Sequence, residues 1–482
     1  MIKLYGEQRR VLFLPAYGPI LIKGVAGSGK TTVSLFRAQY LIKTYNNLFN
    51  SANVCIFTFN KTLVKYITWL QRTSLCEDLD IPSTQFSVPL VTNFHSWVYN
   101  FLLGEGIKLE AIDTKGKRDL IGVIKSRYQG TNIGKKNTDF LAEEFSWIKG
   151  KCIKKKQDYL EIKRNGRGVQ LNKNDRDTVW KMLLDYQKEL RKYHKVDFDD
   201  YALKMLKWLD ENPNFIPPYT HIVVDEGQDL SKAQILVLTK LISASTNSIT
   251  IVADTAQRIY KSGFTWKEVG LSVSGNRSTT FDKNYRNTKQ IAEAANSLLE
   301  KEDDKEGFTP MQVCERTGPK PYLGLFENAN EEDNCIIHIV QEIQEKQASS
   351  SSVVLAHDWS ILTRIYNFLK SRQISCCALS DSNTSININT VVLCTLHSAK
   401  GLEFDNVIIA DINKDSFPCL KNIDEDNIDL QISTERRLLY TAMTRAHNRL
   451  FMLGFGEPSL FISEISSDKT TNNLNEVLTW RN

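Results

Sequence analysis

The sequence predicts an α/β protein with two parallel-sheet domains and a helical insertion in the first. Three observations support this fold class. Short β-branched runs alternate with helical patterns in two separate series, which indicates parallel strands joined by crossover helices. A long polar stretch interrupts the first series, and a glycine-rich loop follows its first run. At 482 residues, the chain also exceeds what one hydrophobic core usually serves.

The first series predicts a discontinuous domain over residues 1–96 and 196–268. Residues 97–195 between its two parts are polar, Lys-rich and helical in pattern, so we expect an inserted helical domain there. The expected strands of the first domain are ILI at 20–22, VCIFT at 54–58, VPLV at 88–91, HIVV at 221–224 and ITIVA at 249–253.

The second series predicts a domain over residues 269–461, followed by a polar tail over 462–482. Cys376 and Cys377 lie in an apolar run that is typical of a strand. Because the nine cysteines include no CxxC pair, we interpret them as reduced core residues. The other expected strands begin at Val353, Val391, Val407 and Arg449.

Composition narrows the class of protein further. The hydrophobic fraction of 41% and the charged fraction of 24% are typical of globular proteins. No apolar run has the length of a membrane span, and the N-terminus lacks the apolar core of a signal peptide. We therefore expect a cytoplasmic protein with no membrane partner.

The net charge of +5 is mild, but its distribution is uneven. Residues 149–167 contain eight Lys and Arg residues against two acidic ones. Such a cluster suits an insertion that binds duplex nucleic acid. It is equally typical of a solvated face, and both interpretations stay open.

The loop GVAGSGKT at residues 24–31 predicts binding of ATP. Its glycines let backbone N–H groups approach phosphate oxygens, and the helix that follows adds its dipole. Lys30 would pair with the β- and γ-phosphates, and Thr31 would ligate Mg²⁺. The residues expected to contact the nucleotide here are Gly24, Val25, Ala26, Gly27, Ser28, Gly29, Lys30, Thr31 and Thr32.

A pair of carboxylates follows the expected strand at 221–224. In the segment IVVDEGQDL, Asp225 would hold Mg²⁺, and Glu226 would orient or deprotonate the attacking water. Acidic residues after a strand are more often caps, but a phosphate loop in the same domain favours the catalytic interpretation. Together these residues predict an ATP-hydrolysing enzyme.

The ordered set of motifs from Gln8 to about Leu453 resembles superfamily 1 DNA helicases of the UvrD/Rep/PcrA type. The segments that carry the resemblance are LYGEQRRVL, GVAGSGKT, TFNK, TNFHSW, DFDD, VVDEGQD, VADTAQRIY, NYRNT, TLHSAKGLEFD and ERRLLYTAMTRA. The resemblance implies two RecA-like domains.

The resemblance also implies roles around the nucleotide. It places Gln8 and Tyr285 at the adenine, Glu403 at the ribose, and Gln257, Arg286 and Arg445 at the γ-phosphate. Two arginines from a second domain would stabilise transition-state charge only when the domains close, which ties hydrolysis to domain motion.

Nucleic-acid contacts are implied in the same way. The candidates are Thr58, Phe59, Asn60, Thr92, Phe94, His95, Tyr260, Trp266 and His397. Aromatic side chains in such positions can stack on bases. For Phe94, a core position is an equal alternative, and His95 and His397 are alternatively buried, hydrogen-bonded histidines.

The chain departs from the family pattern between Lys370 and Val391. The family inserts a regulatory helical domain here, whereas about twenty residues cannot hold a domain. We therefore expect an ATP-dependent translocase or helicase on single-stranded DNA, with 3′ to 5′ direction implied by the resemblance and RNA as an alternative strand. The rival hypothesis is a nucleic-acid-dependent ATPase switch, a regulatory subunit of a partner nuclease or other effector without processive unwinding.

Overall fold

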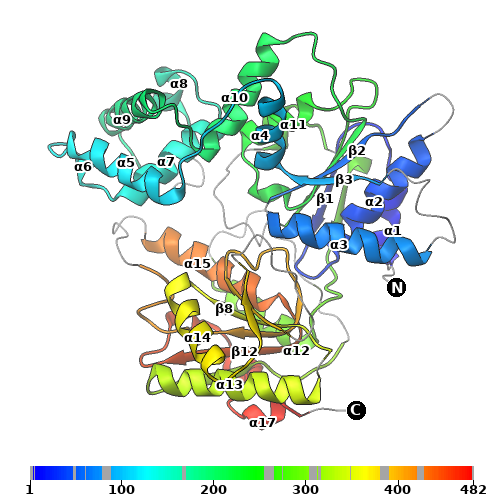
Figure 1. The fold of residues 1–482 in the computed structure, drawn as a ribbon, viewed down its shortest axis with the longest axis vertical. Coiled ribbons are helices and arrows are strands. Elements are labelled where there is room, and N and C mark those ends of the chain that lie inside the picture. Colours follow the sequence, from blue (N-terminus) through cyan, green and yellow to red (C-terminus); the bar gives the residue numbers. More distant parts are fainter. Residues whose placement is uncertain are drawn as a thin grey trace.

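The strands of the protein form two six-stranded parallel sheets (Figure 1). All registered strand pairs within each sheet are parallel. The α/β fold class predicted from the sequence is therefore confirmed. The computed structural model describes residues 4, 6–46, 50–59, 61–78, 88–164, 170–254, 265–273, 275–302, 312, 316–347, 349–379, 390–420 and 428–479.

The first sheet has the strand order β3-β2-β4-β5-β1-β6. Its inner strands are apolar because helices cover both faces, and every residue of β2, β4 and β5 is buried. The strands are β1 (Ile20–Gly24), β2 (Val54–Thr58), β3 (Leu90–Asn93), β4 (His221–Val224), β5 (Ser248–Ala253) and β6 (Ser278–Phe281). The neighbouring helices are α1 (Gly6–Leu12), α2 (Lys30–Tyr45), α3 (Lys61–Asp78), α4 (Phe94–Gly104), α10 (Phe198–Glu211) and α11 (Lys232–Lys240).

The first sheet extends beyond residue 268, where the sequence placed the domain boundary. Strand β6 pairs with β1 through the register Leu21 to Ser278 and Gly24 to Phe281. Helix α4, most of which the sequence assigned to the insertion, contributes Val98 to the core of this sheet. We therefore propose that the first domain includes residues 278–281 and α4.

The second sheet has the order β7-β12-β11-β8-β10-β9. Helices α12 and α15 cover one face, and α13 and α14 cover the other, so two cores flank the sheet. The strands are β7 (Tyr322–Phe326), β8 (Ser352–Ala356), β9 (Cys376–Ala378), β10 (Val391–Thr395), β11 (Phe404–Ile409) and β12 (Ala446–Phe455). The helices are α12 (Lys289–Leu299), α13 (Ala329–Lys346), α14 (Trp359–Ser371) and α15 (Ile428–Met443).

Part of the expected polar tail belongs to this domain. Thr471 pairs with Tyr322 at the edge of the sheet, and Val477 in α17 (Leu474–Val477) is fully buried against the α13 face. Residues 462–479 therefore pack on the second sheet, because scattered apolar side chains anchor an otherwise polar segment.

Helices α5 to α9 form a separate helical layer beside the first sheet, with a hydrophobic core of their own (Figure 1). The two chain segments that lead into and out of it meet at a parallel bridge between Ala111 and Val196. The helices are α5 (Thr114–Ser126), α6 (Asn132–Lys135), α7 (Thr138–Gly150), α8 (Lys156–Glu161) and α9 (Lys173–Lys192).

The basic run at 149–167 is not a uniform solvated face. Lys149 is buried between Asp197 and Asp200, at 2.9 and 2.8 Å. Arg164 is buried against Glu144 at 2.6 Å. These cations therefore stabilise the insertion and its junction. Within the described residues, no helix is both long enough and apolar enough to cross a membrane.

Candidate nucleotide-binding site

The phosphate loop joins β1 to α2 at the carboxyl end of the first sheet. Gly27 and Gly29 have φ values of 70° and 79°, a region that favours glycine. A Cβ atom at Gly29 would lie 2.5 Å from the side chain of Gln8, and one at Gly27 would lie 2.2 Å from that of Asn284. Glycine is therefore required both by the backbone conformation and by neighbours packed against the loop.

The side chain of Gln8, a residue of α1, packs against the phosphate loop, and its Nε2 donates to the Ser28 carbonyl at 2.8 Å. A fully buried arginine of α2, Arg37, holds the end of α1, which carries Gln8. Its guanidinium donates to the carbonyls of Leu12, Leu14 and Pro15 at 2.6, 2.9 and 2.6 Å. Burial lowers the pKa of Arg37 to about 10, so it stays charged at neutral pH.

Lys30 is buried at the start of α2. Its Nζ donates to the carbonyls of Gly24 and Val25 at 3.0 and 2.8 Å and to Asp254 Oδ2 at 3.0 Å. The sequence did not single out Asp254. Its signal was its position directly after β5, at the carboxyl edge where parallel strands present functional side chains.

Asp225 and Glu226 follow β4 and are both buried. Asp225 accepts hydrogen bonds from the hydroxyls of Thr31 and Ser34 at 2.9 and 3.1 Å. Burial, and then the Glu226 carboxylate, raise the pKa of Asp225 to about 7. Burial raises the pKa of Glu226, but Lys400 and other nearby cations outweigh it and lower that pKa. Gln228 also donates to Glu226.

This arrangement fits a divalent cation. A hydroxyl and a carboxylate from Thr31 and Asp225 meet at 2.9 Å, and hard cations such as Mg²⁺ prefer such oxygen ligands. Thr31 and Asp225 are therefore the residues that could hold such a cation.

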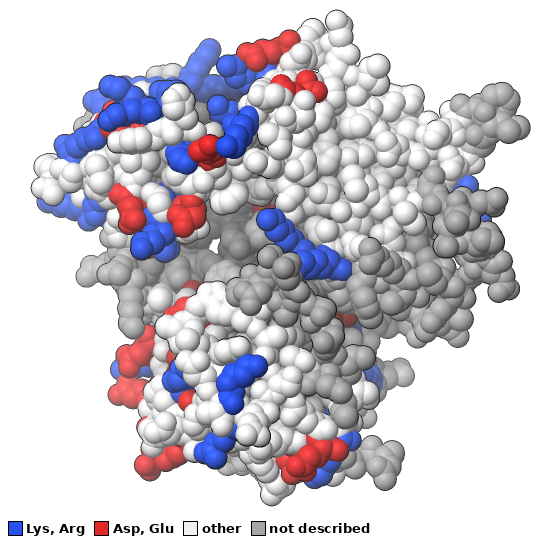
Figure 2. All heavy atoms as spheres, in the orientation of Figure 1, with Lys and Arg blue, Asp and Glu red and all other residues white. Residues whose placement is uncertain are grey.

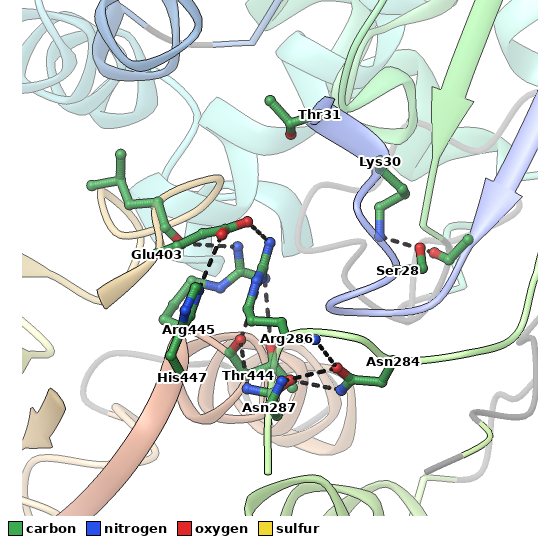
Figure 3. A network of polar contacts seen from close by, with 12 residues as sticks. Ser28, Lys30, Thr31, Asn284, Arg286, Asn287, Glu403, Thr444, Arg445 and His447 are labelled. Carbon is green, nitrogen blue, oxygen red and sulfur yellow. Dashed lines mark hydrogen bonds and ion pairs between the residues drawn. The ribbon is translucent and has the colours of Figure 1, made fainter. Parts of the chain in front are cut away.

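Arg286 reaches this region from the segment between β6 and α12, and Arg445 reaches it from the segment between α15 and β12 of the second sheet (Figure 3). Arg286 pairs with Glu403, and its Nη1 lies 3.4 Å from the Thr444 carbonyl. Arg445 is almost fully buried, and its Nε donates to the Thr441 carbonyl at 2.9 Å. Burial, and then the charge of Arg445, lower the pKa of Arg286 to about 9. Burial also lowers the pKa of Arg445, so both guanidinium groups lie in a desolvated position.

Glu403, expected at the ribose, contacts protein side chains here. It pairs with Arg286, and its Oε2 lies 3.1 Å from His447 Nε2. Burial, and then Arg286, lower the pKa of His447 to about 4, so this histidine is neutral at neutral pH. Tyr285 is 37% exposed, and its N–H donates to the Gly27 carbonyl at 2.9 Å.

One pocket brings these groups together. Its lining comes from both sheets and the segment between them. The first sheet contributes Gly27, Gly29, Lys30, Thr31 and Glu226, the segment between β6 and α12 contributes Arg286, and the second sheet contributes Gly401 and Arg445. Ala26 packs into the hydrophobic core of the second sheet. Val25 and Ser28 are buried, and Thr32 is half-buried.

A buried ion pair crosses between the sheets next to the pocket. Lys400 Nζ, from the HSAKG segment, lies 2.8 and 2.7 Å from the two carboxylate oxygens of Asp229. The two side chains are 3% and 0% exposed. The sequence offered no signal for this contact, because the partners are 171 residues apart.

The candidate nucleic-acid residues divide into three groups. Thr58 and Phe94 are buried, and Phe94 packs in the core of the first sheet, which is one of the two alternatives that the sequence left open for it. Half-buried positions are occupied by Phe59, Thr92, His95, Trp266 and His397. Asn60, Gln257 and Tyr260 lie outside the described residues.

Two exposed aromatic residues were missed as candidates. Phe198 is 49% exposed, and its ring centroid lies 5.5 Å from that of His95. Trp359 is 39% exposed at the start of α14, where the chain leaves β8. Phe198 belongs to the DFDD segment, so the sequence signal for it is an aromatic residue inside a motif.

Two parallel sheets that share a pocket, with a phosphate loop on one and Arg445 from the other, define a two-domain P-loop protein of the RecA-like class. The UvrD/REP helicase N-terminal domain model matches residues 4–264, and the UvrD-like helicase C-terminal domain model matches residues 279–384 and 360–455. The chain therefore belongs to the UvrD/REP helicase family.

Several curated relatives carry helicase names. The chain is 27% identical to a probable DNA helicase II homolog of Mycoplasma capricolum, with 71% of this chain and 47% of that protein covered. It is 26% identical to the ATP-dependent DNA helicase srs2 of Schizosaccharomyces pombe, over 80% and 44%. It is 24% identical to a probable DNA helicase of Mycoplasma pneumoniae, over 92% and 83%. The chain thus spans about half the length of the first relatives it matches.

Proposed function

We propose that this chain is a DNA-dependent ATPase that translocates on single-stranded DNA in the 3′ to 5′ direction and couples ATP hydrolysis to closure of its two sheets. The observation that carries the proposal is the single pocket lined by Lys30, Thr31 and Glu226 together with Arg286 and Arg445. The direction rests on membership of the family alone.

The residues of the first sheet would hold ATP and Mg²⁺. Backbone N–H groups of the phosphate loop and Lys30 would bind the phosphates, and Thr31 and Asp225 would hold the cation. When bound, Mg²⁺ neutralises phosphate charge. Glu226 has a lowered pKa and is therefore anionic, as a group that orients or deprotonates water must be.

Two arginines would act on the γ-phosphate: Arg286 from the segment between β6 and α12, and Arg445 from the second sheet. Both line the pocket, and arginines in that position stabilise the charge that develops in phosphoryl transfer. In this structure Arg286 is paired with Glu403. We propose that the γ-phosphate would replace Glu403 as its partner and that Glu403 would then be available to the ribose.

The proposed path of the DNA strand follows the carboxyl ends of strands in both sheets. His95 follows β3 and lies against the exposed ring of Phe198, while His397 follows β10. Stacking on an exposed aromatic ring contributes roughly 1–3 kcal/mol per base. Burial lowers the pKa of both histidines, so each would contact phosphate as a neutral group.

The insertion supports a nucleic-acid partner through its charge. Residues 97–195 carry 23 Lys and Arg against 13 Asp and Glu, a net charge of +10 in a chain whose total is +5. Figure 2 shows Lys and Arg side chains gathered over this part of the molecule. Such a field attracts phosphate backbones without sequence preference. A duplex ahead of the bound strand is the partner we propose for it.

The site assignment is tested by ATP turnover with and without single-stranded DNA. Lys30→Ala and Glu226→Gln should remove DNA-stimulated hydrolysis. Arg445→Ala should retain ATP binding and lower hydrolysis by about 10³-fold, as loss of arginine fingers does. Arg372→Ala, an exposed arginine at the end of α14, serves as a matched control. Wild-type turnover in Lys30→Ala or Glu226→Gln would contradict the assignment.

Translocation is tested by displacement of streptavidin from either end of a biotinylated strand. A 3′ to 5′ translocase displaces it from the 5′ end only. Displacement from neither end, with DNA-stimulated hydrolysis intact, would favour the ATPase switch. The same assay on RNA would show which strand the chain prefers.

A further inference from the structure

We infer that Asn287 is a positioning residue that sets Arg286 and Arg445 relative to each other and to the phosphate loop. The inference rests on the proposed function, because it assumes that both arginines act on a phosphate bound in the pocket. Asn287 lies in the segment NYRNT directly after Arg286 and is fully buried.

The side chain of Asn287 holds the backbone on both sides of Arg445. Its Nδ2 donates to the carbonyl of Thr444 at 3.1 Å and to that of Ala446 at 2.5 Å. The side-chain amide of Asn287 therefore fixes the backbone on both sides of Arg445, and the backbone of Asn287 directly follows Arg286. The Thr444 carbonyl also accepts from Arg286 at 3.4 Å, so the two arginines share an acceptor (Figure 3).

Asn284 connects this arrangement to the phosphate loop. Its Oδ1 accepts from the backbone N–H groups of Arg286 and Asn287 at 2.9 and 3.0 Å, and its Nδ2 donates to Asn287 Oδ1 at 2.7 Å. The same Oδ1 lies 2.2 Å from where a Cβ of Gly27 would be. The two asparagines thus link the loop to the end of α15 through a short chain of buried contacts.

The chemistry of asparagine suits this task. Its amide carries two donors and an acceptor, and Asn287 uses both capacities at once. Aspartate has the same shape but, when ionised, carries no donor and would face two carbonyl oxygens. Alanine would remove the Asn287 donors from the Thr444 and Ala446 carbonyls, which lets the backbone around Arg445 shift. A misplacement of about 1 Å can lower a rate by about 10²-fold.

The test compares Asn287→Ala and Asn287→Asp with Asn413→Ala, which removes another buried asparagine whose hydrogen bonds lie in the loop after β11. We expect kcat for ATP to fall by about 10²-fold in both Asn287 variants. The affinity for ADP with aluminium fluoride, an analogue of the transition state, should fall by a similar factor. The affinity for ADP alone should not change, because the phosphate loop remains intact.

Additivity separates positioning from a general loss of stability. Added to Arg286→Ala and Arg445→Ala together, Asn287→Ala should change kcat by roughly twofold or less, since the groups it positions are gone. Turnover of Asn287→Ala equal to that of Asn413→Ala would overturn the inference while leaving the proposed function in place. Wild-type turnover of Arg445→Ala would instead overturn the proposed function.

Discussion

The ion pair between Lys400 and Asp229 allows a direct test of how the two sheets are held together. One partner belongs to the segment after β10 and the other to the segment after β4, so the pair exists only while the sheets are in contact. Both side chains are buried, and their charged atoms lie 2.7 and 2.8 Å apart. The perturbation is Lys400→Met, which removes the charge and keeps most of the apolar length.

The expected magnitude follows from burial. Removal of one partner of a buried pair costs about 3–5 kcal/mol, because the other charge stays uncompensated. In the Lys400→Met variant, the uncompensated Asp229 charge can be hydrated if the two sheets separate. The free energy needed to separate the sheets should therefore fall by about 3–5 kcal/mol. At 1.4 kcal/mol per tenfold change, the open population rises by about 10²- to 10⁴-fold.

Native-state hydrogen exchange measures that population. Peptides that cover residues 227–230 and 398–402 should lose protection by about 10²- to 10⁴-fold in Lys400→Met. A peptide from the core of the helical insertion should not change. Lys240→Met is the matched control, because its pair with Asp210 is about half exposed on each side and such pairs contribute 1 kcal/mol or less.

A double variant distinguishes the burial of a charge from the loss of a contact. Asp229→Leu added to Lys400→Met removes the unpaired charge, so most of the lost protection should return. Exchange in Lys400→Met that matches Lys240→Met would refute the argument. It would mean that the pair does not contribute to the contact between the sheets.

Three further predictions concern the first sheet. Burial, and then Arg37, hold the pKa of His221 at about 4. Because the unfolded histidine has a pKa of about 6.5, the contribution of neutral His221 to the free energy of unfolding is complete above pH 6.5 and is lost as the pH falls toward 4. Urea unfolding should therefore give a free energy of unfolding about 2 kcal/mol lower at pH 5 than at pH 7. The same drop in pH should cost His221→Gln less. Gly27→Ala combines a φ of 70° with an overlap against Asn284, so ATP turnover should fall by about 10²-fold in kcat/KM. Arg37→Met should raise KM for ATP by about tenfold with little change in kcat, because α1 would no longer hold Gln8 on the loop.

The sequence predicted the inner strands well because both of their faces are buried. A strand covered by helices on each side must be apolar throughout, and β4 and β5 are examples. Strands β6 (STTF) and β7 (YLGLF) were missed because each is only partly buried at a sheet edge and neither carries a continuous β-branched apolar run. Such strands are defined by hydrogen bonds to a neighbour, and the order of strands is not visible in local composition.

The phosphate loop and the carboxylates after β4 were predictable because contiguous residues carry their chemistry. The partners of those residues were not predictable in this way. Asp254 meets Lys30 across 224 positions, and Lys149 meets Asp197 across 48. A lysine in a basic run and a lysine in a buried ion pair look alike until the acid that faces it is located. The role of Asn287 depends in the same way on two carbonyls that only the fold brings near it.

The contact between the sheets also offers a route from a nucleic-acid strand to the arginines. The segment at residues 58–61, a candidate for binding the strand, leads directly into α3. In α3, Leu63 lies 3.0 Å from where a Cβ of Gly401 would be, and Gly401 lines the pocket. Tyr66, one turn further, packs against the cores of both sheets. Burial raises the pKa of Tyr66, while the charges of Arg286 and Arg445 act to lower it. A strand that shifted residues 58–61 would therefore displace a helix that already contacts the groups proposed to act on ATP. Because binding free energies are linked reciprocally, ATP in the pocket would change the affinity for the strand by the same factor.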